Sequence, residues 1–393
     1  MDELPKVFYD HTIFSIQKFG GISRYYAELI RHSIGLFETE VGIKYSDNQH
    51  LKDILPNLKI FPYPKEIKYG QNFLQKKRNK ILQFLKFNPP QIKGVNYFEI
   101  NQKITLKELC SAKKFIFHPT YYEDYFFEHL GNRPAILTVY DLIHEIFSEY
   151  FSLSDATIEK RKKLLDRANH IIAISHQTKH DLIEIYGLPE EKVSVIHLSH
   201  SFVGNLKVSQ VFSEKINQVK PYLLYTGNRS GYKNFYFFVR CWAVLSKKFP
   251  EVHLVCTGPS FSDEEVKLFH SLGLVDKIHY ISANEEQLFA LYQNALAFVF
   301  PSLYEGFGIP VLEAFQAGCP ALLSDIPVFK EIASNAALFF KPKSYKDMAE
   351  KLEYMIIDSK LRESLRQQGS IIASQFSWQK TAKETASVYR NFI

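Results

Sequence analysis

Two glutamates, Glu305 and Glu313, stand on either side of the glycine-rich stretch Gly306-Phe307-Gly308. Carboxylates accept paired hydroxyl protons, which are the groups that sugars and riboses offer. Glycines let a backbone approach a ligand closely, and the free N–H groups of a helix start attract an anion such as a phosphate. The spacing therefore indicates a site at which one ligand reaches both carboxylates. The alternative is a loop glutamate and a surface helix glutamate with no shared ligand.

Two cations, Arg229 and Lys233, lie four residues apart in a turn that begins at Gly227 and contains Gly231. An arginine chelates oxygens through a planar fork, whereas a lysine acts as a point charge, so together they suit a diphosphate. The alternative is a pair of exposed loop charges. We expect Gly227 and both cations to line the same site as the glutamates.

The elements around these residues follow from local signals. An apolar strand over 297–300 runs into the turn, and a short helix begins near Ile309-Pro310, where a proline is tolerated because its missing N–H would have no partner. Gly318 and Pro320 end that helix, and residues 321–323 begin another buried strand. The turn thus lies at the carboxyl end of a strand, where open α/β sheets bind their ligands.

The string from Glu305 to Ala314, EGFGIPVLEA, followed by Gly318 and Pro320, resembles the signature of the retaining glycosyltransferases of family four, which have the GT-B fold. The resemblance implies that Glu305 contacts the hydroxyls of the donor sugar and that Glu313 holds the ribose. It also implies that the backbone of the turn meets the sugar and the diphosphate, through Gly306, Phe307, Gly308 and Ile309.

The same resemblance assigns further donor contacts. Arg229 and Lys233 match the cations that neutralise the leaving diphosphate, and Gly20-Gly21 match a loop that faces the diphosphate from the opposite domain. The stretch containing Tyr280 and Ile281 corresponds to the place of the nucleobase. Arg24, in the first turn of the helix after the two glycines, is interpreted as a solvated surface group, with added charge at the diphosphate as the alternative.

The group beside the reacting carbon stays open. Family members commonly read T-V-H-D-L-I at one strand of the first domain, and this chain has Tyr140 in place of the histidine while it keeps Asp141. His118 and His144 also follow apolar strands. We predict catalytic roles for His118 and Asp141, with Tyr140 and His144 as alternatives.

Strands and helices alternate throughout, which predicts parallel sheets covered on both faces. Residues 201–220 lose this periodicity, and a new apolar strand begins at Pro221. We therefore predict an α/β fold of the GT-B type, with two Rossmann-like doubly wound domains facing a cleft. The first domain spans residues 1–200, the second spans 221–376, and a final helix over 377–393 packs back on the first.

Residues 65–87 break the pattern, because lysines and an arginine alternate there with apolar residues at helical spacing. Such a helix either packs its apolar stripe on the sheet or lies on an anionic membrane surface, and both can hold. A peripheral membrane contact is one of the two interpretations of this segment.

The composition indicates a globular protein, with 46% hydrophobic and 23% charged residues. Four scattered cysteines without metal-ligand spacing, and a start that lacks a signal-peptide pattern, predict a cytoplasmic location. The modest net charge of +6 and the absence of a nucleic-acid motif argue against nucleic acid as a partner.

The predicted function is transfer of a sugar, with retention, from a nucleotide diphosphate to a hydroxyl of a glycan or lipid-linked acceptor. No D-x-D pair follows a strand in the cleft, so we expect neither a metal nor a cofactor. The similarity of GGISRY (20–25) and GNRSGYKN (227–234) to transferases of polysaccharide and O-antigen assembly favours GDP-mannose over UDP-sugars. The alternatives are a nucleotide-sugar epimerase of the same fold and a catalytically silent binding module.

Overall fold

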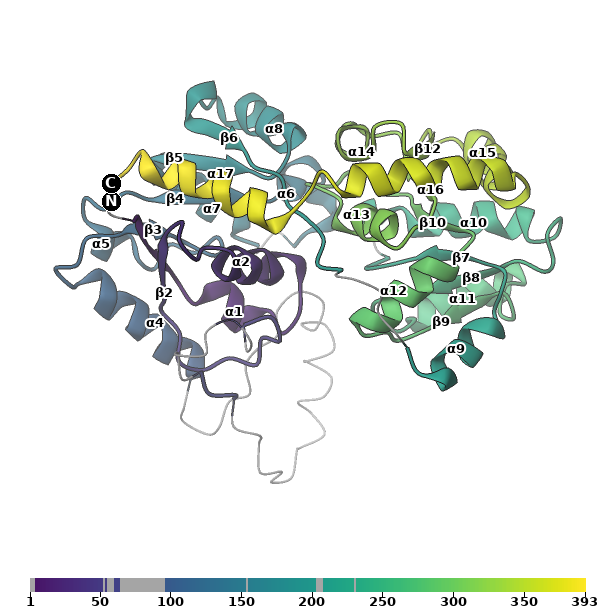
Figure 1. Ribbon diagram of the computed structural model, residues 1–393, viewed down its shortest axis with the longest axis horizontal. Coiled ribbons are helices and arrows are strands. Elements are labelled where there is room, and N and C mark those ends of the chain that lie inside the picture. Colours follow the sequence, from purple (N-terminus) through teal and green to yellow (C-terminus); the bar gives the residue numbers. More distant parts are fainter. Residues whose placement is uncertain are drawn as a thin grey trace.

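The computed structural model describes residues 4–51, 54, 60–63, 96–152, 155–202, 208–229 and 231–393. Figure 1 shows two halves side by side, each built on a sheet with helices around it. The basic segment over 65–87 lies outside the described residues, so its membrane contact stays a prediction. Among the described residues, no helix combines the length and the apolar character that crossing a membrane requires.

The described part of the first half carries six short parallel strands in the order β2-β1-β3 and β4-β5-β6, and an isolated parallel bridge between Phe117 and Ala135 joins the two groups. Their bounds are β1 Lys6–Tyr9, β2 Glu38–Val41, β3 Ile116–His118, β4 Ile136–Val139, β5 His170–Ala173 and β6 Val193–Val195. The strand order reverses between β1 and β3, and ligands of doubly wound sheets bind at the carboxyl ends beside such a reversal.

The second half contains one parallel sheet in the order β12-β11-β10-β7-β8-β9. The strands are β7 Tyr222–Tyr225, β8 His253–Cys256, β9 Ile278–Tyr280, β10 Ala297–Phe300, β11 Ala321–Ser324 and β12 Ala337–Phe340. Counted along the chain this is the order 3-2-1-4-5-6 of the dinucleotide-binding fold, with its switch point between β7 and β10. The turns that carry the predicted cations and glutamates follow these two strands.

Neighbouring residues of these strands enter different cores, because side chains alternate between the two faces of a sheet. Leu224 and Phe298 pack in the core cluster that also contains Val311 of α13, whereas Leu223 and Val299 pack with Trp242 of α10 in the other. The sheet is therefore covered by helices on both faces, as the uninterrupted apolar strands predict.

The helices of the first half are α1 Thr12–Ile16, α2 Gly21–Arg31, α4 Tyr97–Leu109, α5 Phe127–Leu130, α6 Ile143–Ile146, α7 Thr157–Arg167 and α8 His176–Tyr186, with 3-10 turns η1 Ser148–Tyr150 and η2 Glu190–Lys192. Those that follow are α9 Gln210–Asn217, η3 Gly231–Lys233, α10 Phe235–Leu245, α11 Asp263–Leu272, α12 Glu285–Asn294, α13 Ile309–Gln316, α14 Pro327–Ala333, α15 Tyr345–Ile357, α16 Ser359–Ala373 and α17 Trp378–Arg390.

The second strand of the first half differs from its expected bounds. The apolar pattern predicts a strand over 40–45, but β2 covers Glu38–Val41. The side chain of Asn101, on α4, accepts the backbone N–H groups of Lys44 and Tyr45 at 2.9 and 3.1 Å, so these donors are satisfied without a strand partner. Tyr45 instead makes a single parallel bridge with Phe61.

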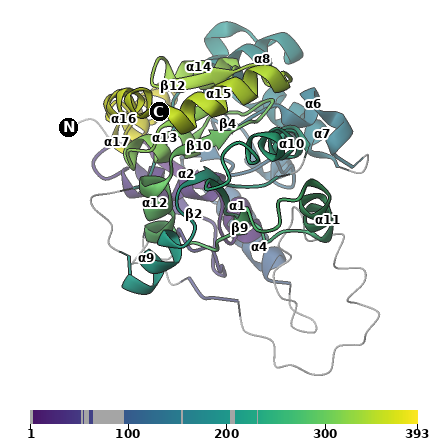
Figure 2. The same ribbon diagram turned by 90° about the vertical axis from the view of Figure 1, so that its right-hand side faces the viewer.

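The last helix, α17, follows α16 of the second half and lies along the first half (Figure 1). In Figure 2, which looks along the molecule, α17 overlaps with α16. Ser377 caps its start by accepting from the backbone N–H of Lys380. Near its end, the Tyr389 hydroxyl hydrogen-bonds with the hydroxyl of Tyr9 at 3.0 Å and with Nδ1 of His118 at 2.7 Å. Side chains from both ends of the chain thus meet in one buried cluster.

Candidate active site

The first part of the site is the turn after β7. Gly227 has a φ of 102°, a conformation that side chains strongly disfavour, and the chain then passes through η3 to α10. Lys233 ends η3, and its Nζ donates to Oε1 of Glu305 across 2.7 Å. Glu305 lies in the turn after β10, and its Oε1 also accepts from the hydroxyl of Ser302 at 2.6 Å. The switch point therefore brings the predicted cation and the predicted carboxylate together.

This ion pair is largely sheltered, with 18% of the Lys233 side chain and 12% of the Glu305 side chain exposed. Burial by itself would lower the pKa of Lys233, but the charge of Glu305, with further contributions from Tyr232 and Asp141, raises the pKa above its usual value. Lys233 is accordingly held in its charged form. Asp141 follows β4 of the first half, so groups from both halves act on this lysine.

Arg229 is held by groups of the second half, and its predicted contact with the diphosphate stays a prediction. Its Nε and Nη2 donate to the two carboxylate oxygens of Glu265 at 2.6 and 3.2 Å, and Nη2 also donates to the carbonyls of Pro259 and Ser260 at 2.7 and 2.9 Å. Glu265 in turn closes the capping box of α11 with Ser262. Arg229 is buried, and only its Nη1 has no hydrogen-bond partner among the described groups. It thus anchors the turn rather than reaching Glu305 beside Lys233.

Glu313, in the second turn of α13, is also buried. Its Oε1 accepts from Nη1 of Arg24 at 3.2 Å, and its Oε2 accepts from the hydroxyl of Tyr292 at 3.4 Å. A second carboxylate, that of Glu285 at the start of α12, lies 3.7 Å from Nη2 of Arg24. The expectation that Arg24 is a solvated surface group is therefore wrong, because it is only 8% exposed and pairs across the two halves.

Two helix starts face each other beside these pairs. Gly21 opens α2 and Gly308 precedes α13, and neither N-cap glycine offers a side chain, although Oε1 of Gln17 accepts from the backbone N–H of Ser23 in α2 at 3.2 Å. A methyl group added to Gly21 would lie 4.0 Å from Cδ1 of Ile309, so the two starts are close. Helix N-termini carry partial positive charge, and a phosphate placed there is stabilised. Of the Gly20-Gly21 pair, Gly20 is extended and Gly21 is the first helical residue.

The backbone at Gly306 lies close to the other half. A Cβ at this position would lie 1.7 Å from the carbonyl oxygen of Tyr140, which no side-chain adjustment can relieve. The Gly306 carbonyl accepts from the hydroxyl of Thr178 at 3.3 Å, and the adjacent Phe307 is buried with its ring 5.9 Å from that of His197. The glycine of this turn is therefore required by contact with the other half.

The structure separates the four residues left open beside the reacting carbon. His118 is fully buried, with Nδ1 bonded to Tyr389 and Nε2 to Thr138 at 2.9 Å, and burial lowers its pKa to about 3. Tyr140 is buried, and its hydroxyl donates to the carbonyl of Thr120 at 3.3 Å. Both are therefore left out of the site that we propose.

The other two residues lie nearer the surface. His144 is half-buried, with its ring stacked on Phe151 at 3.9 Å and its Nε2 3.5 Å from Asp155. Asp141 is half-buried and is among the charges that act on Lys233, while its Oδ1 accepts from the backbone N–H of Ile143 at 3.2 Å. Asp141 also lies near the turn that carries Glu305, because a Cβ added to Gly306 would be 3.0 Å from Cβ of Asp141.

The residues expected at the nucleobase lie at the end of β9, the edge strand of the second sheet. Tyr280 ends β9, and its hydroxyl donates to the carbonyl of Gly258 at 3.1 Å, while Ile281 is buried. Gly258 touches the turn after β7, because a Cβ there would lie 2.7 Å from the carbonyl of Gly227. These contacts are largely backbone and apolar, so they encode little about the identity of a base.

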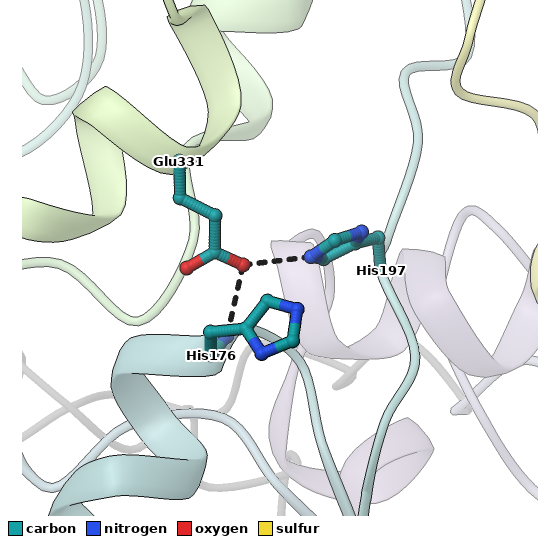
Figure 3. Close-up of side chains that lie close together, drawn as sticks. All are labelled: His176, His197 and Glu331. Atoms are coloured by element: carbon teal, nitrogen blue, oxygen red, sulfur yellow. Dashed lines mark hydrogen bonds and ion pairs between the residues drawn. The ribbon is translucent and has the colours of Figure 1, made fainter.

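A third set of side chains, His176, His197 and Glu331, joins the two halves at a place apart from Glu305 and Glu313. Figure 3 shows Glu331 of α14 between His197 and the start of α8, with one oxygen 2.7 Å from Nε2 of His197. The carboxylate also accepts the backbone N–H groups of His176 and Gln177 at 2.8 and 3.3 Å. Ligand atoms of His176, His197 and Glu331 lie within 4.8 Å of one another. The positive end of α8 favours a carboxylate and disfavours a cation there, so we interpret the set as a helix cap in trans.

Two Rossmann-like halves that meet at the switch point of the second sheet, with a cation–carboxylate pair and two helix starts at their contact, define a protein of the GT-B class. Family models agree. Residues 208–371 match the model described as "Glycosyl transferases group 1", and residues 118–198 match "Glycosyltransferase Family 4". Together these matches cover more than half of the chain, which belongs to glycosyltransferase family four.

Individual relatives support the same assignment. The chain is 30% identical over 247 residues to the O-antigen chain mannosyltransferase RfbU of Salmonella typhimurium, an alignment that covers 57% of this chain and 66% of that protein. It is 24% identical over 385 residues to the O-antigen chain mannosyltransferase B of Escherichia coli, covering 94% and 96%. The crystal structure of Anabaena Alr3699/HepE with UDP and glucose superposes with a TM-score of 0.70 at 16% identity, covering 99% and 100%. The predicted family and fold are therefore confirmed, and the chain is a glycosyltransferase.

Proposed function

We propose that this protein transfers a mannosyl group, with retention, from GDP-mannose to a hydroxyl of a glycan or lipid-linked acceptor, without a metal ion. The observation that carries the proposal is the Lys233–Glu305 pair at the switch point, beside the facing starts of α2 and α13. A diphosphate between those helix starts would have peptide N–H groups on both sides and a charged lysine at its sugar end.

In this proposal the leaving diphosphate gains negative charge while positive charge spreads over the sugar ring. Lys233 and the helix starts interact more strongly with that transition state than with the bound donor, so they lower the barrier. Glu305 accepts hydrogen bonds from the sugar hydroxyls, and Glu313 accepts hydrogen bonds from the ribose hydroxyls. Arg229 supports the reaction indirectly, by fixing the turn to Glu265.

Neither glutamate acts as a nucleophile in this scheme. A glycosidase that retains configuration flanks one bond with two carboxylates about 5–5.5 Å apart. Here Glu305 is bonded to Lys233 and Ser302, whereas Glu313 is bonded to Arg24 and Tyr292. Because the two carboxylates are held by separate sets of groups, we propose front-face attack, with the diphosphate taking the acceptor proton. Asp141 is proposed to lie at the acceptor side.

The donor and the acceptor are proposed from the relatives. Both O-antigen relatives are mannosyltransferases by name, which supports GDP-mannose and a saccharide acceptor. The Anabaena protein, in contrast, was crystallised with UDP and glucose. The predicted base site, formed by Tyr280 and Ile281, does not distinguish guanine from uracil. UDP-sugars are therefore the competing donors that the test must include.

The test combines a binding panel with product analysis. We expect GDP and GDP-mannose to raise the melting temperature more than UDP and UDP-sugars do, since a ligand at 100 times its Kd adds about 2.7 kcal/mol. With a lipid-linked saccharide as acceptor, the product should carry an α-linked mannose, and turnover should persist in EDTA. Donor incubated alone should give slow hydrolysis and no free epimer. An inverted linkage, or a strict loss of turnover in chelator, would contradict the proposal.

A further inference from the structure

Arg24 connects the first half of the protein to the carboxylate that we propose for ribose binding. It lies in the first turn of α2, directly after the Gly20-Gly21 loop, and its Nη1 donates to Oε1 of Glu313 across 3.2 Å. Both side chains are 9% exposed. The pair is therefore buried at the contact between the halves, beside the start of α13.

Within the second half, Glu313 has no cation of its own among the described residues. Its neighbours there are the hydroxyl of Tyr292, at 3.4 Å from Oε2, and the carboxylate of Glu285, which pairs with the other nitrogen of Arg24 at 3.7 Å. A buried carboxylate without a partner is costly, and in practice it takes up a proton. The counter-charge for Glu313 is thus supplied by the opposite half.

We propose that Arg24 is a positioning residue for the nucleotide: by pairing with Glu313 it holds this carboxylate in place for the ribose hydroxyls, so that recognition of the ribose is complete only when the two halves are in contact. This inference rests on the proposed function. The inference adds to the proposed function a residue of the first half, Arg24, that controls how the second half recognises the nucleotide.

The hydrogen-bonding capacity of Glu313 allows both partners. A carboxylate offers about four lone-pair positions. Arg24 uses one of them on Oε1, and the weaker contact with Tyr292 is on Oε2. Paired ribose hydroxyls could therefore be accepted while Arg24 remains bound. A protonated Glu313 would offer one acceptor fewer and would no longer form hydrogen bonds assisted by its charge.

Titration supports the same view. The pKa of Glu313 lies above its usual value because burial raises it most; the charge of Arg24 limits that rise, the charge of Glu285 adds to it, and the hydrogen bond from Tyr292 lowers the pKa. Replacing Arg24 with a neutral residue removes the main opposing influence. Glu313 would then bind its proton more tightly, and the ionised form would be recovered only at higher pH.

The test compares a ribonucleotide with its 2′,3′-dideoxy counterpart by calorimetry, using whichever of GDP and UDP the wild-type protein binds. Hydrogen bonds to a charged group should make wild-type Kd for the ribonucleotide lower by about tenfold or more. Arg24→Gln should lose this ratio near neutral pH and regain it as the pH is raised. Arg24→Lys should keep part of it. Arg31→Gln, on the exposed side of the same helix, is the matched control and should keep all of it.

Glu285→Gln provides a second variant that does not depend on the stability of the Arg24 variants. Its side chain is 42% exposed, and removing its charge should let Glu313 stay ionised to lower pH, so the ribose preference should persist at more acidic pH than in the wild type. An Arg24→Gln protein that keeps the wild-type ratio at every pH overturns the inference. So does one that loses affinity for both nucleotides equally, because Arg24 would then act on the diphosphate or the fold.

The proposed function and this inference fail in different ways. A wild-type protein that binds neither GDP nor UDP refutes both. A wild-type protein that binds and turns over donor, but binds the ribonucleotide and its dideoxy form equally, refutes only the role of Glu313 and Arg24 at the ribose.

Discussion

Replacing Lys233 by alanine removes the cation that the proposed mechanism aims at the leaving diphosphate. In the structure its Nζ contacts Glu305 at 2.7 Å, and less than a fifth of either side chain is exposed. Removing one preorganised group of this kind costs about 3–4 kcal/mol of transition-state stabilisation, which is about a hundredfold to a thousandfold in kcat. Lys233→Arg keeps the charge on a differently shaped group, so we expect a smaller loss.

Folding should suffer much less than turnover. Glu305 keeps its hydrogen bond from Ser302 at 2.6 Å in the alanine variant, and we expect a cost of about 1–3 kcal/mol for the partner left behind. The assay is release of nucleoside diphosphate at saturating donor, with a thermal melt of the same sample. Lys248→Ala is the matched control, because Lys248 also pairs with a glutamate at 2.6 Å but lies on the surface. Full kcat in Lys233→Ala would refute the role of this lysine.

Three further outcomes follow from contacts between or near the halves. Gly306→Ala should lower both the melting temperature and donor affinity, because the new methyl group would meet the Tyr140 carbonyl at 1.7 Å; an unchanged melt would show that this contact is not fixed. Glu265→Gln weakens the anchor of Arg229, and we expect a raised KM for the donor measured by steady-state kinetics, with the fold retained because α11 keeps its neutral cap; an unchanged KM would contradict the positioning role. Burial raises the pKa of Glu331, but the hydrogen bonds that the carboxylate accepts outweigh burial and lower the pKa below its usual 4.5. The ionised carboxylate therefore contributes its full stabilisation above pH 4.5, and this stabilisation is lost as the pH falls through the pKa of the folded state. Acid titration of the wild type should therefore show a steeper loss of melting temperature than that of Glu331→Gln, and parallel curves would argue against it.

Much of the site followed from signals that are local in the sequence. The start of α13 at Ile309 was predicted from the glycine and proline around it, and Ser175, which follows a strand, has a residue type typical of the N-cap that it forms for α8. Such features depend on neighbours within one helical turn, so the sequence displays both partners. The fold class was predictable for the same reason, because alternating strands and helices allow few topologies.

Partners that are distant in the sequence were not predictable in this way. The sequence around Arg24 predicts a surface residue of its helix, because its buried partner Glu313 is 289 residues further along the chain. Arg229 reads as a cleft cation beside Lys233, yet Glu265 binds it with two oxygens. Ser262 and Glu265 have the spacing of a capping box, so the cap itself was detectable, but its second use as a partner for an arginine was not.

The two ion pairs divide the proposed site into parts of different origin. Lys233 and Glu305 both belong to the second half, so the sugar end of the site is assembled by one sheet and its two turns. Glu313 belongs to the second half but Arg24 to the first, so the ribose end needs both. If this division is correct, separation of the halves would weaken the hold on the nucleotide at the ribose while leaving Lys233 and Glu305 in place. Binding of the nucleotide would then favour contact between the halves, because the ligand prefers the state in which Glu313 is paired.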